Sequence, residues 1–323
     1  MRAVFVTRFG GPEVMVLGEA PDPVPGAGQV LVDVAFAGVT FVETQIRAGT
    51  DRWHERPELP FVPGSMVAGR VAAVGAGADS AWVGRRVLAG TGETGGFAER
   101  AVADAGELIP VPDGLDLSVA LALHTDGSTA LGLVEGARIE PGDWVLVEAA
   151  AGGVGSILVQ LAAAAGAHVV AAARGTRKLD AARALGAAAV VDYSEPGWAE
   201  RVREVTGGGP DVVFDGVGGA IGRAAFEVTA RGGRFSVHGA SSGEPTVVDP
   251  HEALDRGVRV LALEQLFTFG PRMHGWAEGI MAAAVAGRVR PMVGQTFPLD
   301  RAAAAHAAIE SRQALGKTLI TMN

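Results

Sequence analysis

The segment DWVLVEAAAGGVGSILVQLAAAAG, which begins at Asp143, constrains the fold of this chain more than any other stretch. It places an apolar run, a glycine turn and an alanine-rich helical pattern in the order that a dinucleotide-binding G-x-G-x-x-G motif requires. Ala150 occupies the first glycine position of that motif, Gly152 the second and Gly155 the third, and Gly153 is an additional glycine. Gly152 has no Cβ to obstruct a pyrophosphate, Gly155 lets the helix lie close to the sheet, and the helix N-terminus supplies amides and a partial positive charge. A purely structural turn is the alternative in a chain with 47 glycines, but the flanking strand and helix favour nucleotide binding.

After Asp126 the chain alternates between short apolar runs and helical patterns, which is typical of a parallel sheet. Six strands with crossover helices make a complete doubly wound domain, so we predict an α/β fold with a six-stranded parallel Rossmann sheet. The strands are expected at Trp144–Glu148, His168–Ala173, Ala189–Tyr193, Val212–Asp215, Arg234–His238 and Val258–Leu263, and the helices at Ser156–Ala165, Lys178–Leu185, Trp198–Val205 and Ala220–Ala230.

The first part of the chain, to about Leu121, has a different pattern. Strand patterns such as QVLVDVAFAGV and GSMVAGRVAAVG are separated by Gly and Pro, which predicts an antiparallel, barrel-like region with one short helix from Phe41. Residues 264–323 contain two helical patterns and a final apolar strand, KTLITM, expected to pack on this first region. We therefore expect one domain from residues 1–122 and 264–323, and a second from residues 123–263.

The end of the second Rossmann strand indicates which dinucleotide binds. An NAD site carries an acidic residue there, whereas a 2′-phosphate needs positive charge. Here the sequence reads VVAAARGTRKLD, with Arg174, Arg177 and Lys178 at that point, and the first acid, Asp180, lies inside the next helix. Arg can bind a phosphate through several donors and Lys through a point charge, so NADPH is predicted in preference to NADH.

Composition excludes several other functions. The chain has no cysteine, so it has no disulfide, no thiolate zinc site and no cysteine nucleophile. A net charge of −9, with basic residues spread along the chain, argues against nucleic-acid binding. No unbroken apolar run reaches the roughly 20 residues of a membrane span, and the N-terminus begins with a strand pattern rather than a signal peptide. We expect a cytoplasmic protein without membrane or nucleic-acid partners.

Several motifs together resemble the zinc-independent, zeta-crystallin-like quinone oxidoreductases of the medium-chain dehydrogenase/reductase superfamily. They are EAAAGGVGSILVQLAAAAGA, DVVFDGVGG, HGASSG and LGKTLITMN, together with GVTFVETQIRAG and PGSMVAGRVAAVG near the N-terminus. The resemblance covers essentially the whole chain. It implies a chaperonin-10-like (GroES-like) catalytic domain, an NADP-binding Rossmann domain, and a cleft between them for the nicotinamide and the substrate.

The resemblance also implies roles for individual residues. The glycine turn would face the pyrophosphate, Lys178 and Tyr193 the adenosine 2′-phosphate, and Lys317 the nicotinamide end. The full cofactor set implied by motif and resemblance is Thr129, Gly152, Gly153, Val154, Gly155, Arg174, Lys178, Tyr193, Val217, Gly239, Ser241, Ser242 and Lys317.

Two departures from the superfamily patterns matter. Gly64, Ser65 and Met66 stand where zinc alcohol dehydrogenases have a GHE element, so no metal site is expected. Thr40 stands where many quinone reductases have Asn, with Glu43 in place of Asp. Thr40 is the candidate catalytic hydroxyl, although a Thr at this place can also serve only as a helix cap.

Without a metal or a free tyrosine, the expected acceptor is a quinone or an activated enone, whose reduction gives a delocalised anion that solvent can protonate. Thr40 or Thr129 could donate a hydrogen bond to its oxygen. An enoyl-thioester reductase and a non-catalytic NADPH-binding protein remain as alternatives. The last Rossmann strand, in GVRVLALEQL, could pair with a second copy, so a homodimer is expected.

Overall fold

The structure is a computed structural model that describes residues 1–322. The chain forms two compact units, one from Met1–Thr125 with Ala277–Asn323 and the other from Asp126–Trp276. Both unit boundaries lie later in the chain than the domain limits expected from the sequence. They fall inside the helices α2 (Leu117–Ala137) and α8 (Gly270–Val285), and a continuous helix shows no change of composition at which a boundary could be placed. The division into a catalytic and an NADP-binding domain at the expected residues stays a prediction.

The unit Asp126–Trp276 contains a six-stranded sheet in the order β10-β9-β8-β11-β12-β13. Every neighbouring pair in it is parallel, which confirms the doubly wound Rossmann fold. The expected strands are found within one residue at their ends, except that the last is shorter because a 3-10 helix begins at Leu263. The strands are β8 Trp144–Val147, β9 His168–Ala173, β10 Ala189–Asp192, β11 Val212–Asp215, β12 Arg234–Val237 and β13 Arg259–Leu261.

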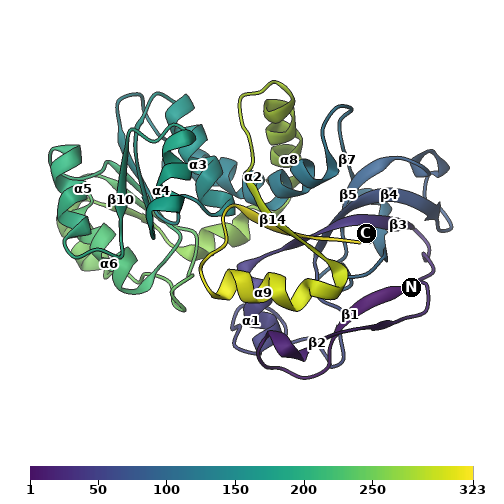
Figure 1. Ribbon diagram of the computed structural model, residues 1–323. Coiled ribbons are helices and arrows are strands. Elements are labelled where there is room, and N and C mark those ends of the chain that lie inside the picture. Colours follow the sequence, from purple (N-terminus) through teal and green to yellow (C-terminus); the bar gives the residue numbers. More distant parts are fainter. Residues whose placement is uncertain (323) are drawn as a thin grey trace. The chain divides into compact units, whose positions relative to one another are not determined.

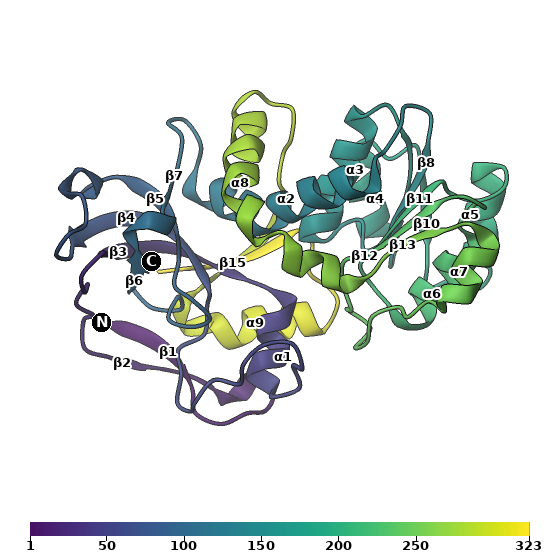
Figure 2. The same cartoon turned by 180° about the vertical axis from the view of Figure 1, so that it is seen from behind.

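Helices cover both faces of this sheet. Figure 2 shows α3 and α4 on one face and α5, α6 and α7 on the other. Their bounds are α3 Gly153–Ala164, α4 Thr176–Ala184, α5 Trp198–Thr206, α6 Gly219–Val228 and α7 Pro250–Arg256. Apolar side chains such as Phe226 and Phe235 fill the core beside the sheet. Their rings pack edge to face with centroids 5.4 Å apart.

The start of α3 corrects the sequence-based prediction. The helix was expected from Ser156 but begins at Gly153, so Val154 and Gly155 belong to its first turn. Glycine is a poor helix former, and for that reason the sequence pattern placed the helix start too late. Close packing against the end of β8 outweighs this propensity.

The other unit is built on antiparallel strands (Figure 1). A seven-stranded sheet runs β14-β15-β3-β4-β5-β7, with β6 also paired to β3, and β1 pairs with β2 in a separate ribbon. The final strand pairs antiparallel with β3, which confirms that KTLITM packs on the first region. The strands are β1 Arg2–Val6, β2 Met15–Glu19, β3 Gln29–Val39, β4 Met66–Val74, β5 Arg86–Gly90, β6 Arg100–Asp104, β7 Ile109–Pro110, β14 Val293–Pro298 and β15 Lys317–Thr321.

The strand β14 was not predicted from the sequence. Its strand alternates between half-buried and exposed residues, and it pairs parallel to β15, so the sheet is not wholly antiparallel. The helices assigned wholly to this unit are α1 Phe41–Ala48 and α9 Ala302–Glu310.

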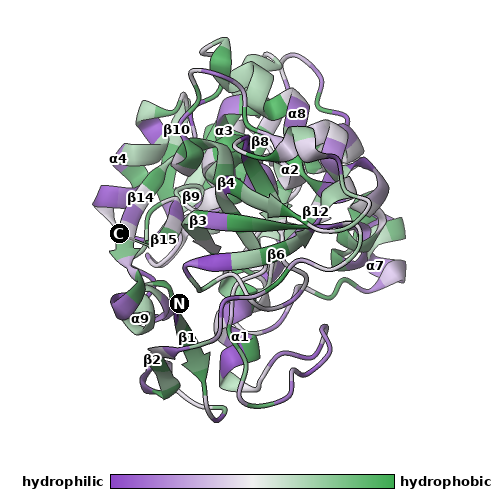
Figure 3. Ribbon diagram, turned by 90° about the vertical axis from the view of Figure 1, so that its right-hand side faces the viewer, coloured by the Kyte–Doolittle hydropathy of each residue, from purple (hydrophilic) through white to green (hydrophobic). Residues whose placement is uncertain are grey.

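The period-two pattern of β3 explains how this unit forms its core. Val30, Val32 and Val34 are buried, while Asp33 between them points outward. These valines join a cluster that includes Phe97 and Ile320. Figure 3 shows β1 as a mainly hydrophobic strand, in line with its place against the same core.

The helix α2 (Leu117–Ala137) is long and apolar enough, by length and composition alone, to cross a membrane. Core helices of globular proteins meet the same criterion, and half of the apolar window of α2 is buried within the structure. Its buried residues include Leu121, Leu123 and Leu133. The expected absence of a membrane partner stays a prediction.

Candidate active site

The turn between β8 and α3 closes so tightly that position 155 admits only glycine without movement of the main chain. A Cβ on Gly155 would lie 2.9 Å from the carbonyl carbon of Ala149 and 3.0 Å from the Cα of Ala150. Ala149 itself has a φ of 48°, a left-handed conformation that costs a non-glycine residue about 1–3 kcal/mol. This geometry agrees with the packing role expected of Gly155, while its contact with a cofactor stays a prediction.

The first turn of α3 has a glycine N-cap and faces an acid of α2. Gly152 is the N-cap, and without a side chain it cannot cap the first amides of the helix. Asp126 of α2 was not singled out from the sequence, yet a Cβ on Gly153 would lie 2.7 Å from its Cγ. A carboxylate beside a helix N-terminus is electrostatically favourable. Thr129, one turn after Asp126 on α2, is half-buried.

The carboxyl ends of β9 and β10 bring together the residues expected at a 2′-phosphate. Arg174 directly follows β9, Lys178 lies in the first turn of α4, and the amide of Tyr193 donates to the carbonyl of Ala173 at 3.3 Å. Sheet register therefore places Tyr193 beside the end of β9, while its contact with a cofactor stays a prediction. The ring of Tyr193 packs edge to face on Trp198 at 6.4 Å.

Asp192 is an acid at this place that the sequence analysis missed. Its Oδ2 accepts from the amide of Gly175 at 2.8 Å, and its Oδ1 accepts from the amide of Ser194 at 2.8 Å. Burial acts to raise the pKa of Asp192, but the hydrogen bonds from Ser194 and Gly175 lower it overall, with help from Arg174. The Asp192 carboxylate therefore stabilises the turn that follows Arg174.

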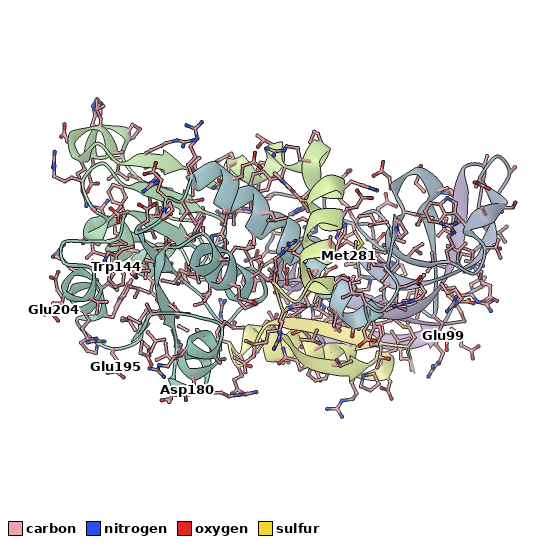
Figure 4. All side chains as sticks on the ribbon, turned by 90° about the horizontal axis from the view of Figure 1, so that it is seen from above. Glu99, Trp144, Asp180, Glu195, Glu204 and Met281 are labelled. Atoms are coloured by element: carbon pink, nitrogen blue, oxygen red, sulfur yellow. The ribbon has the colours of Figure 1, made fainter. Side chains whose placement is uncertain are left out.

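Asp180 does not occupy the strand end. It lies on α4, is exposed, and forms an ion pair of 2.8 Å with Arg183 (Figure 4). This agrees with the interpretation of the sequence, in which the first acid after β9 lies within the helix.

The loops after β11 and β12 meet each other closely. The amide of Ser242 donates to the carbonyl of Val217 at 2.8 Å, and a Cβ on Gly239 would lie 2.6 Å from the oxygen of Gly216. A Cβ on Gly219 would likewise lie 2.9 Å from the Oγ of Ser242. Three expected cofactor residues, Val217, Gly239 and Ser242, are therefore neighbours, and Ser241 precedes Ser242 in the same loop.

The other expected residues, Thr40 and Lys317, lie together in the antiparallel unit. Pairing of Val39 with Thr318 sets Thr40 and Lys317 next in register at the end of β3. Thr40 is the N-cap of α1 and forms a capping box with Glu43. Its hydroxyl donates to Oε2 of Glu43 at 3.0 Å and accepts from the Glu43 amide at 3.3 Å.

Glu43 is the centre of this polar group. Its Oε2 also accepts from the amide of Thr40 at 2.7 Å, while its Oε1 accepts from the amide of Ser65 at 3.1 Å and from the Ser65 hydroxyl at 3.2 Å. Burial raises the pKa of Glu43, and the hydrogen bonds from Thr40 and Ser65 and the Lys317 ammonium offset this only in part. Ser65, at the position of the zinc-binding histidine in zinc alcohol dehydrogenases, is thus bonded to a carboxylate.

The part of the chain that the structure describes contains no group of three or more His, Asp or Glu side chains placed to hold a metal ion. Operation without zinc stays a prediction.

A 3-2-1-4-5-6 parallel sheet with a glycine turn after its first strand, joined to an antiparallel GroES-like unit, defines the chain as a medium-chain dehydrogenase/reductase. Comparison with protein families agrees. Residues 26–113 match the family "Alcohol dehydrogenase GroES-like domain", and residues 153–270 match the family "Zinc-binding dehydrogenase".

Relatives that are similar over nearly the whole chain show which family within this superfamily the protein belongs to. The chain is 35% identical to a 2-haloacrylate reductase of a Burkholderia species, over 98% of each chain. It is 32% identical to a quinone oxidoreductase of Sus scrofa, over 100% of this chain and 98% of the relative. Among solved structures, the Escherichia coli quinone oxidoreductase in complex with NADPH matches with a TM-score of 0.90 at 28% identity, over 99% of this chain and 100% of the other. The chain belongs to the quinone oxidoreductase family of the medium-chain dehydrogenase/reductases.

The glycine turn yields a test of stability. Gly155→Ala is expected to lower the free energy of unfolding by about 1–3 kcal/mol, because its methyl group would strike main-chain atoms that cannot move independently. Gly152→Ala is the matched control, since its Cβ would lie 3.1 Å from the oxygen of Ala149, a contact relieved by a shift of a few tenths of an ångström. Urea denaturation of both variants measures the difference, and equal stabilities would show that the close approach of α3 is not required.

The capping box yields a second test. Thr40→Val keeps the shape of the side chain but removes both hydrogen bonds to Glu43, so we expect a loss of about 1 kcal/mol in thermal or urea unfolding. Thr40→Ser, which retains the hydroxyl, should remain near the wild type. If the two variants unfold alike, the hydroxyl contributes nothing to the cap.

Proposed function

We propose that this protein is an NADPH-dependent reductase of quinones or activated enones. The observation that carries the proposal is the grouping of Arg174, Lys178 and Tyr193 at the ends of β9 and β10, in a chain similar over its whole length to quinone oxidoreductases. Positive charge there suits a 2′-phosphate, and the oxygens of the nearby Asp192 accept hydrogen bonds from main-chain amides.

The residues present fit this cofactor. The amides that begin α3 lie beyond a glycine N-cap, where a pyrophosphate is favoured by the helix dipole. We assign the pyrophosphate to Gly152, Gly153, Val154 and Gly155, and the middle of the cofactor to Thr129 and to the paired loops of Val217, Gly239, Ser241 and Ser242. Lys317 is assigned to the nicotinamide end. When bound, NADPH supplies the hydride.

The polar groups of this chain favour an acceptor that needs little help from an acid. The single tyrosine, Tyr193, lies at the end of β10 and is assigned to the adenosine side. The proton of the Thr40 hydroxyl is directed to Glu43, so Thr40 can donate to an acceptor oxygen only by exchanging that bond. Reduction of a quinone or enone gives a delocalised anion that water can protonate, whereas a simple ketone needs a stronger acid or a metal.

The relatives support both kinds of acceptor. One is named a quinone oxidoreductase and another a 2-haloacrylate reductase, and a 2-haloacrylate is an alkene conjugated to a carboxylate. We propose Thr40 as the hydroxyl that contacts the acceptor once its bond to Glu43 is exchanged. An enoyl-thioester reductase and a non-catalytic NADPH-binding protein are the alternatives that the assay below separates from this function.

We further propose that the protein works as a cytoplasmic homodimer. The strand β13 ends the sheet order and has a neighbour only on the β12 side among the described strands. Pairing of this edge with a second copy would satisfy its main-chain groups.

The function is tested by NADPH consumption with a simple quinone, a 2-haloacrylate, a linear enone and an enoyl thioester. We expect turnover with the quinone or the activated alkenes and little with the thioester, because the acidic chain shows no sequence signature of a site for a phosphopantetheine arm. Preference for the thioester would support the alternative reductase. Binding of NADPH without turnover of any acceptor would support the non-catalytic alternative.

The cofactor assignment has its own test. Arg174→Ala should weaken NADPH binding about tenfold and Arg174→Ala with Lys178→Ala about a hundredfold, since each charged contact to a phosphate contributes about 1.5–3 kcal/mol before solvent screening at this exposed site. NADH binding should change little, because it lacks the 2′-phosphate. Arg183→Ala is the matched control, because this arginine lies on α4 like Lys178 but pairs with Asp180. Equal losses for NADPH and NADH would contradict the assignment.

A further inference from the structure

Two carboxyl groups are fully buried side by side at the carboxyl edge of the Rossmann sheet. Glu148 directly follows β8 and Asp215 ends β11, and both side chains have 0% exposure. Val147 pairs with Phe214, and the amide of Glu148 donates to the carbonyl of Phe214, so Glu148 and Asp215 are next in register and point to the same face. Two adjacent carboxylates cannot both stay ionised in such a place without a large cost.

The two acids differ in their hydrogen bonds. Oδ1 of Asp215 accepts from the amides of Val217 at 2.9 Å and Gly218 at 2.7 Å. Within residues 1–322, by contrast, no hydrogen bond of good geometry reaches Oδ2 of Asp215 or either oxygen of Glu148, and the nearby amide of Val217 lowers the pKa of Glu148 only in part. Two amide donors stabilise the ionised form of Asp215, which leaves Glu148 as the member of the pair that keeps a proton.

The surrounding groups fit a neutral acid at Glu148. Gly222 of α6 lies so close to the pair that a side chain would not fit there, since a Cβ on it would lie 2.8 Å from Cγ of Asp215. The titratable neighbour is His238, after β12, and burial lowers the pKa of its imidazole, which keeps it neutral at pH 7. Helix α3, packed against β8, carries no titratable side chain, and Arg223 of α6 is bonded to Glu227 and Glu252. No cation among the described residues therefore neutralises the pair.

The pair holds a turn that also carries expected cofactor contacts. Asp215 fixes the amides of Val217 and Gly218, and the carbonyl of Val217 accepts from Ser242 of the next loop. Gly218 has a φ of 75°, and a Cβ on it would lie 3.1 Å from the carbonyl carbon of Glu244. A shift of Asp215 would thus move Val217 and Ser242 together.

We propose that Glu148 is a positioning residue for cofactor binding: as a neutral acid it donates a hydrogen bond to Oδ2 of Asp215, and the pair fixes the turn from Asp215 to Gly218. The inference rests on the proposed NADPH function. The single proton stays between Glu148 and Asp215, and no group is oxidised or reduced.

The pair makes cofactor binding sensitive to pH. Burial, followed by the charge of Asp215, raises the pKa of Glu148 well above its ordinary value. Because the folded-state pKa exceeds that of the unfolded chain, the stability contributed by the shared proton is present at low pH. It is lost as the pH rises through the folded-state pKa.

The test compares Glu148→Gln with Glu148→Met. The side-chain amide of the Glu148→Gln variant can donate to Asp215 as the neutral acid does but cannot ionise, whereas the thioether of the Glu148→Met variant has a similar size and no donor.

We expect Glu148→Gln to bind NADPH within about twofold of the wild type at pH 7, and Glu148→Met to bind about tenfold more weakly, by fluorescence titration. As the pH is raised above neutrality, affinity should fall in the wild type more than in Glu148→Gln.

The inference is overturned if Glu148→Met binds like the wild type, or if Glu148→Gln and the wild type share one pH profile. Should Glu148→Met fail to fold, the comparison of Glu148→Gln with the wild type decides alone. Failure of the proposed function gives a different result, since the wild type would then bind no NADPH at any pH. In that case urea unfolding decides whether the proton is shared, because the wild type should lose stability with rising pH relative to Glu148→Gln.

Discussion

The close approach of α3 to the end of β8 is the constraint on which the rest of the Rossmann unit depends. It requires the main chain at Ala149 to adopt a left-handed conformation and position 155 to lack a side chain. In return, the first amides of α3 lie directly at the carboxyl edge of the central strand. The order of the parallel strands then brings the ends of β9, β11 and β12 to that same edge, so that residues distant in sequence converge there.

Buried or half-buried acids shape this edge. Asp192 holds the turn before α4, Asp215 holds the turn after β11, and Asp126 lies against the start of α3. An acidic edge would be unsuited to an anionic cofactor if its charges were free, but the first two of these carboxylates already accept hydrogen bonds from main-chain amides. Their role is to fix the backbone that presents Arg174 and Val217. In the antiparallel unit, Glu43 plays a comparable part by accepting four hydrogen bonds from Thr40 and Ser65.

The sequence predicted the fold well because its signals are local. The glycine turn and the alternation of strands and helices predicted the six-stranded parallel sheet, and the final apolar strand predicted the return of the chain to the first unit. The boundary of α3 was misplaced because tertiary packing overrides the low helix propensity of glycine. The strand β14 was missed because its alternating residues are only half-buried and give a weak pattern.

The candidate site was predictable where a motif marked it and not where tertiary contacts create it. Arg174 and Lys178 followed from the end of the second Rossmann strand and Tyr193 from the family resemblance, whereas Asp126 reaches Gly153 only through the packing of α2. Glu148 did carry a signal, a charged residue at the end of an otherwise apolar strand, but its partner Asp215 is found only from the register between β8 and β11.

The most direct test of the central claim is a calorimetric titration of the wild-type protein with NADPH and with NADH under identical conditions. If the glycine turn and the cationic strand end together hold an NADP-type dinucleotide, NADPH should bind at least about tenfold more tightly than NADH. Equal affinities, or tighter binding of NADH, would contradict the assignment of Arg174 and Lys178 to the 2′-phosphate.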